Sequence, residues 1–134
     1  MTRDRLRAHI EEIERSYEFF LAYAAQGAAR EEATKVGAQL REFLGGMNDA
    51  LAAIETDLPS LVDEEALEPE AAYRDVLAIT AADAGRAGSA VRLVLAQPSI
   101  SSELVDNLNA SIHLRTLLTD LFLLDEALPK GTGG

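Results

Sequence analysis

The sequence predicts an all-α fold, an antiparallel four-helix bundle in up-down-up-down order, for three reasons. Apolar residues make up 48% of the chain and are mostly Leu and Ala, which favour helix over sheet. Four long stretches repeat apolar residues at intervals of three and four, the period of a helix with one buried face. Short turns within the first and second pairs of stretches make neighbouring helices antiparallel.

A chain of 134 residues fits a single domain, which we place at residues 1–128. Residues 129–134, PKGTGG, are expected to form a flexible C-terminal tail. A domain of this size buries roughly two-thirds of its unfolded surface, so a stable core needs no covalent staples. The chain has no Cys, which excludes disulfides, thiolate metal sites and Cys nucleophiles.

The first helix is expected from Arg3 to Ala25. Beyond it the apolar pattern slips by about two residues, so we place a tight turn at 26–29 with Gly27 as the left-handed residue that ends the helix. The inward stripe of this helix is spaced 4, 3, 4, 3 and 4 residues and consists of Leu6, Ile10, Ile13, Tyr17, Phe20 and Ala24.

The second helix is expected from Arg30 to Asp57, although the turn before it offers no ordinary N-cap residue. Gly45 and Gly46 lie inside this helix, where each costs up to roughly 1 kcal/mol relative to Ala. We interpret them as a close helix crossing, with a slight kink as the alternative. The acidic stretch 58–68 then predicts a surface loop, either irregular throughout or with one short turn of helix. It does not match the spacing of an EF-hand, and a solvated charge run is the simpler interpretation than a cation site.

The third helix is expected to begin with Pro69 at its first position and to end near Ala96. Its middle, AITAADAGRAGSA, consists almost entirely of small residues. Small residues let bulky rings of a neighbouring helix approach closely, and Tyr17, Phe20 and Phe43 are the candidates.

The fourth helix is expected to follow a Ser99 or Ser101 cap and to run without interruption to Leu128. Between Leu117 and Leu128, eight of twelve residues are apolar, which is more than a small monomeric core needs and indicates a central position or an oligomer contact. A heptad-like seam consists of Leu114, Leu117, Leu121, Leu124 and Leu128. A polar face, expected to meet water, consists of Asp106, Asn109, His113, Thr116 and Asp120.

The net charge of −11, from 23 acids and 12 bases, argues against a nucleic-acid or anionic-membrane surface. The N-terminal stretch has no apolar core of a signal peptide, and no run of 18 apolar residues occurs. We therefore expect a cytoplasmic protein without a membrane partner. The preference for Arg over Lys and the many alanines are typical of GC-rich bacterial or archaeal genomes.

The sequence offers little metal or catalytic chemistry. A carboxylate-bridged di-iron bundle needs Glu-x-x-His, whereas Leu6 and Ala110 stand three residues before the two histidines, His9 and His113. No metal and no cofactor are therefore expected, with a non-covalent haem on His9, His113 or Met47 as an open alternative. No nucleophile elbow and no phosphate-binding loop is visible, so we expect the protein not to be an enzyme.

His113 carries one alternative function. An exposed His midway along a four-helix bundle resembles the phosphoacceptor of histidine phosphotransfer domains. Those domains typically carry Lys and Gly three and four residues after the His, where this chain has Thr116 and Leu117. The resemblance implies a phosphorelay adaptor with His113 as the possible phosphoacceptor. A surface His beside Asn109 and Asp106 is the simpler interpretation.

The surplus of apolar residues on the first and last helices predicts a protein–protein interaction module, first of all a homodimer. A two-fold axis perpendicular to the bundle would join the two surplus regions in an antiparallel dimer. The expected interface residues are Phe19, Tyr23, Leu118, Phe122 and Leu123. The alternative is a carrier of a small apolar ligand or cofactor, with a pocket lined by Tyr17, Phe20, Phe43, Met47, Ala84 and Gly88.

Overall fold

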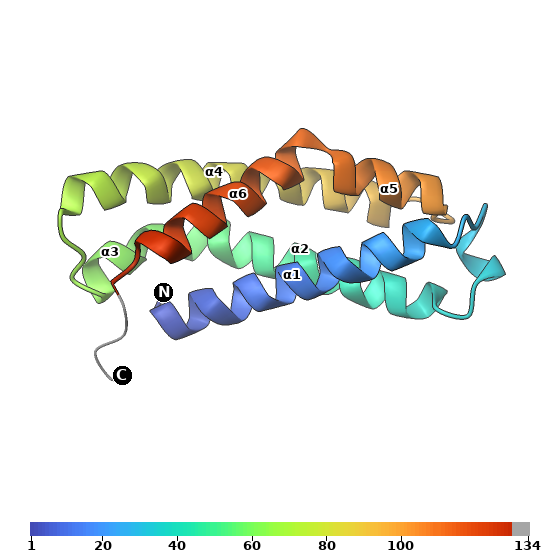
Figure 1. Ribbon diagram of the computed structural model, residues 1–134, viewed down its shortest axis with the longest axis horizontal. Helices are drawn as coiled ribbons and strands as arrows, with labels where there is room; N and C mark the ends of the chain where they lie inside the picture. Colours follow the sequence, from blue (N-terminus) through green and yellow to red (C-terminus); the bar gives the residue numbers. More distant parts are fainter. Residues whose placement is uncertain (130–134) are drawn as a thin grey trace.

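The computed structural model describes residues 1–129 and is all-α, with no strand within that range (Figure 1). Residues 130–134, most of the predicted tail, lie outside the described residues. The five main helices are α1 (Arg3–Ala25), α2 (Gly37–Asp57), α4 (Glu70–Leu95), α5 (Ser102–Ala110) and α6 (Ile112–Ala127). Three short helical segments connect them: η1 (Glu31–Ala33), η2 (Leu58–Ser60) and α3 (Leu61–Glu64).

The main helices pack in an antiparallel order, α1 on α2, α2 on α4 and α4 on α6. Figure 1 shows α4, α5 and α6 along one side of the elongated molecule, with α1 and α2 along the other. The principal partners of α1 are α2 and α5, whereas α6 packs mainly on α4. Among residues 1–129, no helix is both long enough and apolar enough to cross a membrane.

The predicted first helix is confirmed at both ends. The hydroxyl oxygen of Thr2 caps its start by accepting a hydrogen bond from the backbone N–H of Arg5 at 3.2 Å. Gly27 ends it with a φ of 64°, in the left-handed region that glycine adopts without strain. The inward stripe is buried at Leu6, Ile10, Ile13 and Phe20.

The predicted start of the second helix is wrong, because α2 begins at Gly37 and not at Arg30. Between them lies η1, where Glu31 is buried and its carboxylate is bound by Arg41 and by the backbone N–H of Ile100. Arg41 belongs to α2, whereas Ile100 lies far along the chain, so these contacts tie η1 to both segments. The glycines of α2 do not mark a close backbone crossing: Gly45 faces open space and Gly46 adjoins the carboxylate of Glu12.

The acidic stretch is more ordered than the predicted surface loop. It contains η2 and α3, and its apolar residues are buried in the core. Arg74 of α4 binds Asp63 and Glu70 at 2.7 Å each, which ties the stretch to the start of α4. Pro69 follows a cis peptide bond and stands just before α4, not at its first position. The buried residues are Leu58, Leu61, Val62 and Leu67.

The predicted fourth helix is interrupted at Ser111, whose ψ of 132° is not helical. Ser101 caps α5 by accepting a hydrogen bond from the backbone N–H of Leu104, and Ser111 caps α6 by accepting one from His113. The break rotates the polar residues onto different surfaces. Asn109 is buried, with its side-chain amide donating to the carbonyl oxygen of Tyr17 at 3.4 Å, so the expected common polar face does not form. All five leucines of the predicted seam are buried.

Candidate interaction surface

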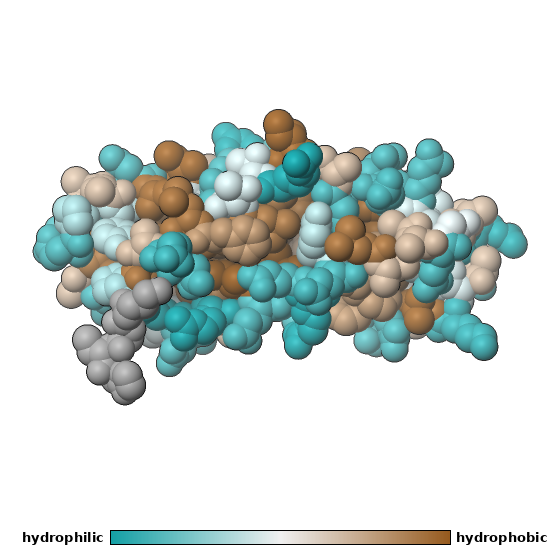
Figure 2. Space-filling model, viewed as in Figure 1, coloured by the Kyte–Doolittle hydropathy of each residue, from teal (hydrophilic) through white to brown (hydrophobic). Residues whose placement is uncertain are grey.

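Helix α6 carries three of the large apolar side chains that are exposed in the described chain. Ile112 is 72% exposed, Phe122 is 55% exposed and Leu123 is 62% exposed. Single exposed leucines are ordinary on protein surfaces, whereas several on one short helix mark a contact surface. Figure 2 shows hydrophobic residues spread across the face that α1 and α6 form together.

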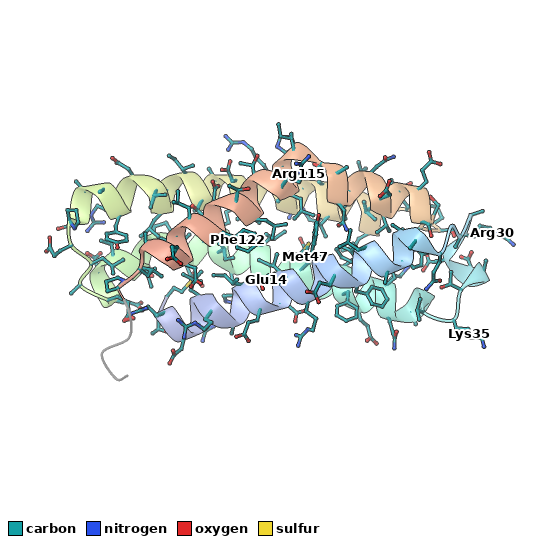
Figure 3. All side chains as sticks on the ribbon, in the orientation of Figure 1. Glu14, Arg30, Lys35, Met47, Arg115 and Phe122 are labelled. Atoms are coloured by element: carbon teal, nitrogen blue, oxygen red, sulfur yellow. The ribbon has the colours of Figure 1, made fainter. Side chains whose placement is uncertain are left out.

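A groove of about 360 Å³ lies between α1 and α6, which we call the α1/α6 groove. It exists because the break at Ser111 lets α6 pack on α4, so that α1 and α6 do not close against each other. The wall on α1 consists of Glu14, Tyr17 and Glu18. The wall on α6 includes Arg115, Leu118 and Phe122. Figure 3 shows Glu14 on α1, with Arg115 and Phe122 on the opposite side.

The two walls of the α1/α6 groove carry opposite charges. Glu14 and Glu18 are exposed on α1, and Arg115 is exposed on α6. None of the three belongs to an ion pair within residues 1–129. The groove thus combines apolar side chains with an acidic wall and a basic wall, both of which are open to a partner from outside.

A second groove, the α4/α6 groove, lies on the other side of α6 and measures about 250 Å³. Leu123 and Ala127 of α6 face Ala72 and Val76 of α4 across it. The hydroxyl of Tyr73 donates to the carbonyl oxygen of Ala127 at 2.7 Å, so the phenol is used to fix the end of α6. The remaining lining is apolar. Phe122 lines the α1/α6 groove and Leu123 lines the α4/α6 groove, so these two neighbours stand between the grooves.

A pair of carboxyl groups lies where α4 meets α6. The Oδ2 atom of Asp120 is buried with no donor to bind it, and the carboxyl of Asp83 is within hydrogen-bonding reach. Burial, followed by hydrogen bonding and charge repulsion from Asp83, together raise the pKa of Asp120 to about 7. Arg86 binds the other side of Asp83 at 2.9 Å. The pair can hold a shared proton, which makes this seam sensitive to pH.

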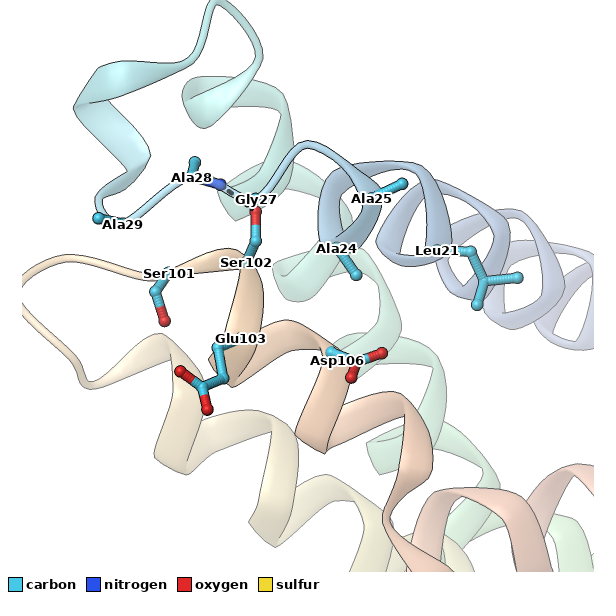
Figure 4. A pocket seen from close by; sticks show the side chains of 10 residues that line it. All are labelled: Leu21, Ala24, Ala25, Gly27, Ala28, Ala29, Ser101, Ser102, Glu103 and Asp106. Carbon is cyan, nitrogen blue, oxygen red and sulfur yellow. Dashed lines mark hydrogen bonds between the residues drawn. The ribbon is translucent and has the colours of Figure 1, made fainter.

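A third groove, about 840 Å³, lies where α1 ends and α5 begins (Figure 4). Its lining is mostly small residues around Gly27 and Ala28, with the carboxylates of Glu103 and Asp106 at α5. Ala28 and Ser102 bind each other through two hydrogen bonds, N–H to Oγ at 2.9 Å and N–H to carbonyl oxygen at 2.8 Å. The hydroxyl of Ser102 thus serves the fold, and the buried polar atoms without a partner within residues 1–129 lie outside this groove.

The structure separates the five residues predicted as an interface. Phe122 and Leu123 are exposed on α6, whereas Leu118 is 8% exposed. Tyr23 is fully buried, and its hydroxyl donates to the carbonyl oxygen of Ile100 at 2.6 Å, so it lies in the core and not on the surface. Phe19 is half-buried and stacks on Phe43 of α2, with ring centroids 4.4 Å apart.

The six residues predicted as a ligand pocket lie in or against the core. Phe20, Met47, Ala84 and Gly88 are buried. Tyr17 and Phe43 pack against the same core from its edge. Of the six, only Tyr17 lines one of the grooves described above.

His113 is exposed in the first turn of α6, as expected, but Asp106 is on a different helix and Asn109 is buried. His9 is half-buried on α1, and burial lowers its pKa, with Arg5 as the next cause. Within residues 1–129, no three His, Asp or Glu side chains are placed to hold a metal ion together.

The sequence prediction missed the charged walls of the α1/α6 groove. It gave no role to Glu14, Glu18 or Arg115. A signal was present, because Arg115, Leu118 and Phe122 are spaced three and four residues apart and so share one helical face. Comparisons of this chain with protein-family models, with curated proteins and with solved structures give no match.

Proposed function

We propose that this chain is a non-enzymatic helical protein that acts by binding protein through α6, as a homo-oligomer or as an accessory subunit. The observation that carries the proposal is the exposure of Phe122 and Leu123 between two grooves of one short helix. Burying apolar surface is the main driving force of protein association, and aromatic residues contribute most to it. We call Phe122 and Leu123 the α6 anchor.

The proposal includes an architecture. Helices α5 and α6 together act as one interrupted fourth helix of an up-down-up-down four-helix bundle. The interruption at Ser111 turns the second part of this helix toward α4 and leaves the α1/α6 groove open. The break at Ser111 therefore accounts both for the open α1/α6 groove and for the exposure of the α6 anchor beside it.

The lining of the grooves supports binding more than catalysis. No His or Ser lines either groove beside α6. The hydroxyl of Thr119, in the α1/α6 groove, donates its proton to the carbonyl oxygen of Arg115 at 2.9 Å and not to a side-chain base. A carrier function has less support, because the residues expected to line a ligand pocket are packed in or against the core.

The test is native mass spectrometry of the protein purified from its own host, as wild type and as the double variant Phe122→Asp/Leu123→Asp. We expect the wild type to show the mass of a complex larger than one chain, and the double variant to show the mass of a single chain. Leu93→Asp is the matched control, because Leu93 is 63% exposed on α4, away from α6, and should leave the complex intact. A wild type that is a monomer at tens of micromolar, with no other protein bound, contradicts the proposal.

A further inference from the structure

We infer that the occupant of the α1/α6 groove is the same groove of a second copy of this chain, in a two-fold dimer whose axis runs along the groove. The inference rests on the proposed function and names its partner. It starts from the charges of the groove, which has Glu14 and Glu18 on one wall and Arg115 on the other.

The direction of a two-fold axis decides which walls meet. An axis along the groove exchanges the two walls, so that Arg115 faces the partner's Glu14 and the partner's Glu18. The symmetry repeats this contact, and both copies therefore use all three charges. An axis perpendicular to the groove would place the acidic wall against the partner's acidic wall, where like charges repel.

The residues between the charges suit the centre of such an interface. Tyr17 on the acidic wall and Leu118 and Phe122 on the basic wall supply the apolar side chains of the groove, and Phe122 is more than half exposed. An apolar centre that contains Tyr and Phe, with Arg and carboxylates at the rim, is the usual composition of a protein interface. With the axis along the groove, Phe122 of each copy faces the α1 wall of the partner.

The structure also removes the support for the perpendicular axis that the sequence suggested. That arrangement needs an apolar surplus at the end of α1, from Phe19 to Tyr23. Tyr23 is buried and Phe19 stacks on Phe43, so only Leu21 of that region is a large exposed apolar residue. Of the two grooves beside α6, the α1/α6 groove is the one whose walls carry the opposite charges that a second copy can pair.

The experiment uses two charge variants of the full chain. Variant one is Arg115→Glu, which makes both walls acidic, and variant two is Glu14→Arg/Glu18→Arg, which makes both walls basic. We expect each variant alone to dimerise about tenfold more weakly than wild type, because its walls repel the walls of its own copy. An equimolar mixture should form a heterodimer, because every acidic wall then faces a basic one.

Light scattering between 10 and 100 μM, about the range where wild type is expected to dimerise, gives the mass, and native mass spectrometry distinguishes the heterodimer by composition. Circular dichroism checks that each variant is folded. The control is Arg30→Glu, an exposed Arg at the far end of the molecule (Figure 3), which makes the same charge change and should not affect dimerisation.

The outcomes separate the inference from the proposed function. A wild type that dimerises regardless of the charge variants, or a mixture of folded variants that stays monomeric, overturns the inferred pairing. A purified wild type that is monomeric throughout this range also overturns it. In each of these cases the proposed function is decided separately, by whether the α6 anchor is needed for a complex in the host.

Discussion

Arg41 donates two hydrogen bonds to the carboxylate of Glu31, from Nε to Oε2 at 2.8 Å and from Nη2 to Oε1 at 2.6 Å. The same guanidinium donates to the carbonyl oxygens of Leu95 at 3.1 Å and Gln97 at 2.9 Å. Oε1 of Glu31 also accepts a hydrogen bond from the backbone N–H of Ile100 at 3.0 Å. One pair of side chains thus joins the connection between α1 and α2 to the connection between α4 and α5.

Arg41→Ala is expected to lower the free energy of unfolding by about 2–3 kcal/mol, because it leaves the buried carboxylate of Glu31 without its charged partner. Urea denaturation followed by circular dichroism measures the change. Arg41→Lys keeps the charge but loses the paired hydrogen bonds of the guanidinium. Its free energy of unfolding should therefore lie between those of wild type and Arg41→Ala. A cost below about 0.5 kcal/mol for Arg41→Ala would mean that the pair is a passive surface contact.

Two glycines of α2 are expected to respond in opposite directions to Ala. A Cβ at Gly45 meets open space, so Gly45→Ala should raise stability by up to about 1 kcal/mol through helix propensity. A Cβ at Gly37 would lie 2.7 Å from the backbone oxygen of Glu31, so Gly37→Ala should lower stability by about 1–3 kcal/mol. The two melting temperatures, measured side by side, test the contrast, and equal shifts would contradict it.

Asp120 is expected to make the protein less stable as the pH rises. Its pKa is raised to about 7 from the ordinary 3.8, so between these values the folded state holds a proton that the unfolded state releases. The contribution of the Asp120 carboxyl to the free energy of unfolding is fully present below pH 4 and is lost as the pH rises toward 7. Asp120→Asn should flatten this dependence and be more stable than wild type at pH 8 by about 1 kcal/mol.

The measurement for Asp120 is the free energy of unfolding between about pH 4.5 and pH 8.5, spanning the raised pKa. The control is Asp125→Asn, which changes an exposed carboxylate on the same helix and should keep the wild-type slope. If Asp120→Asn shows the same slope as wild type, the Asp83–Asp120 pair is not the group that titrates.

Ser111→Ala is expected to lower stability by about 1 kcal/mol, because α6 loses the hydroxyl that accepts a hydrogen bond from the backbone N–H of His113. Thermal unfolding measures the loss. Ser89→Ala is the control: the hydroxyl of Ser89 donates to the carbonyl oxygen of Gly85 inside α4, where Ala is the better helix former. If Ser111→Ala loses no more stability than Ser89→Ala, the Ser111 cap does not stabilise the start of α6.

Local pattern and caps were enough to predict the helices whose ends are decided by neighbouring residues. Helix α1 starts at Arg3, just before its apolar stripe begins, and ends at the left-handed Gly27, as the sequence predicts; the Thr2 cap was not predicted. The leucine seam of α6 is buried as its spacing predicts. The apolar surplus near the C-terminus also pointed to Phe122 and Leu123, which are exposed.

Contacts between distant residues decided the rest. The apolar period continues through Ser111, so nothing in the sequence marked the break that opens the α1/α6 groove. Glu31 reads as a solvent-exposed acid until the fold brings it to Arg41 and Ile100. Tyr23 and Phe122 are both aromatic residues in apolar stretches, yet Tyr23 is buried with its hydroxyl bound and Phe122 is exposed.

The sequence by itself determined which residues are apolar and at what helical spacing, and this fixed the all-α class and the faces of single helices. Tertiary structure decided which apolar residues are covered by a neighbour and which charges stand across a groove. The physical reason is that periodicity is a property of one helix, whereas burial and charge pairing depend on how two helices are placed. That placement depends here on the Ser111 break and on the Glu31–Arg41 pair, which act through contacts between separate parts of the chain.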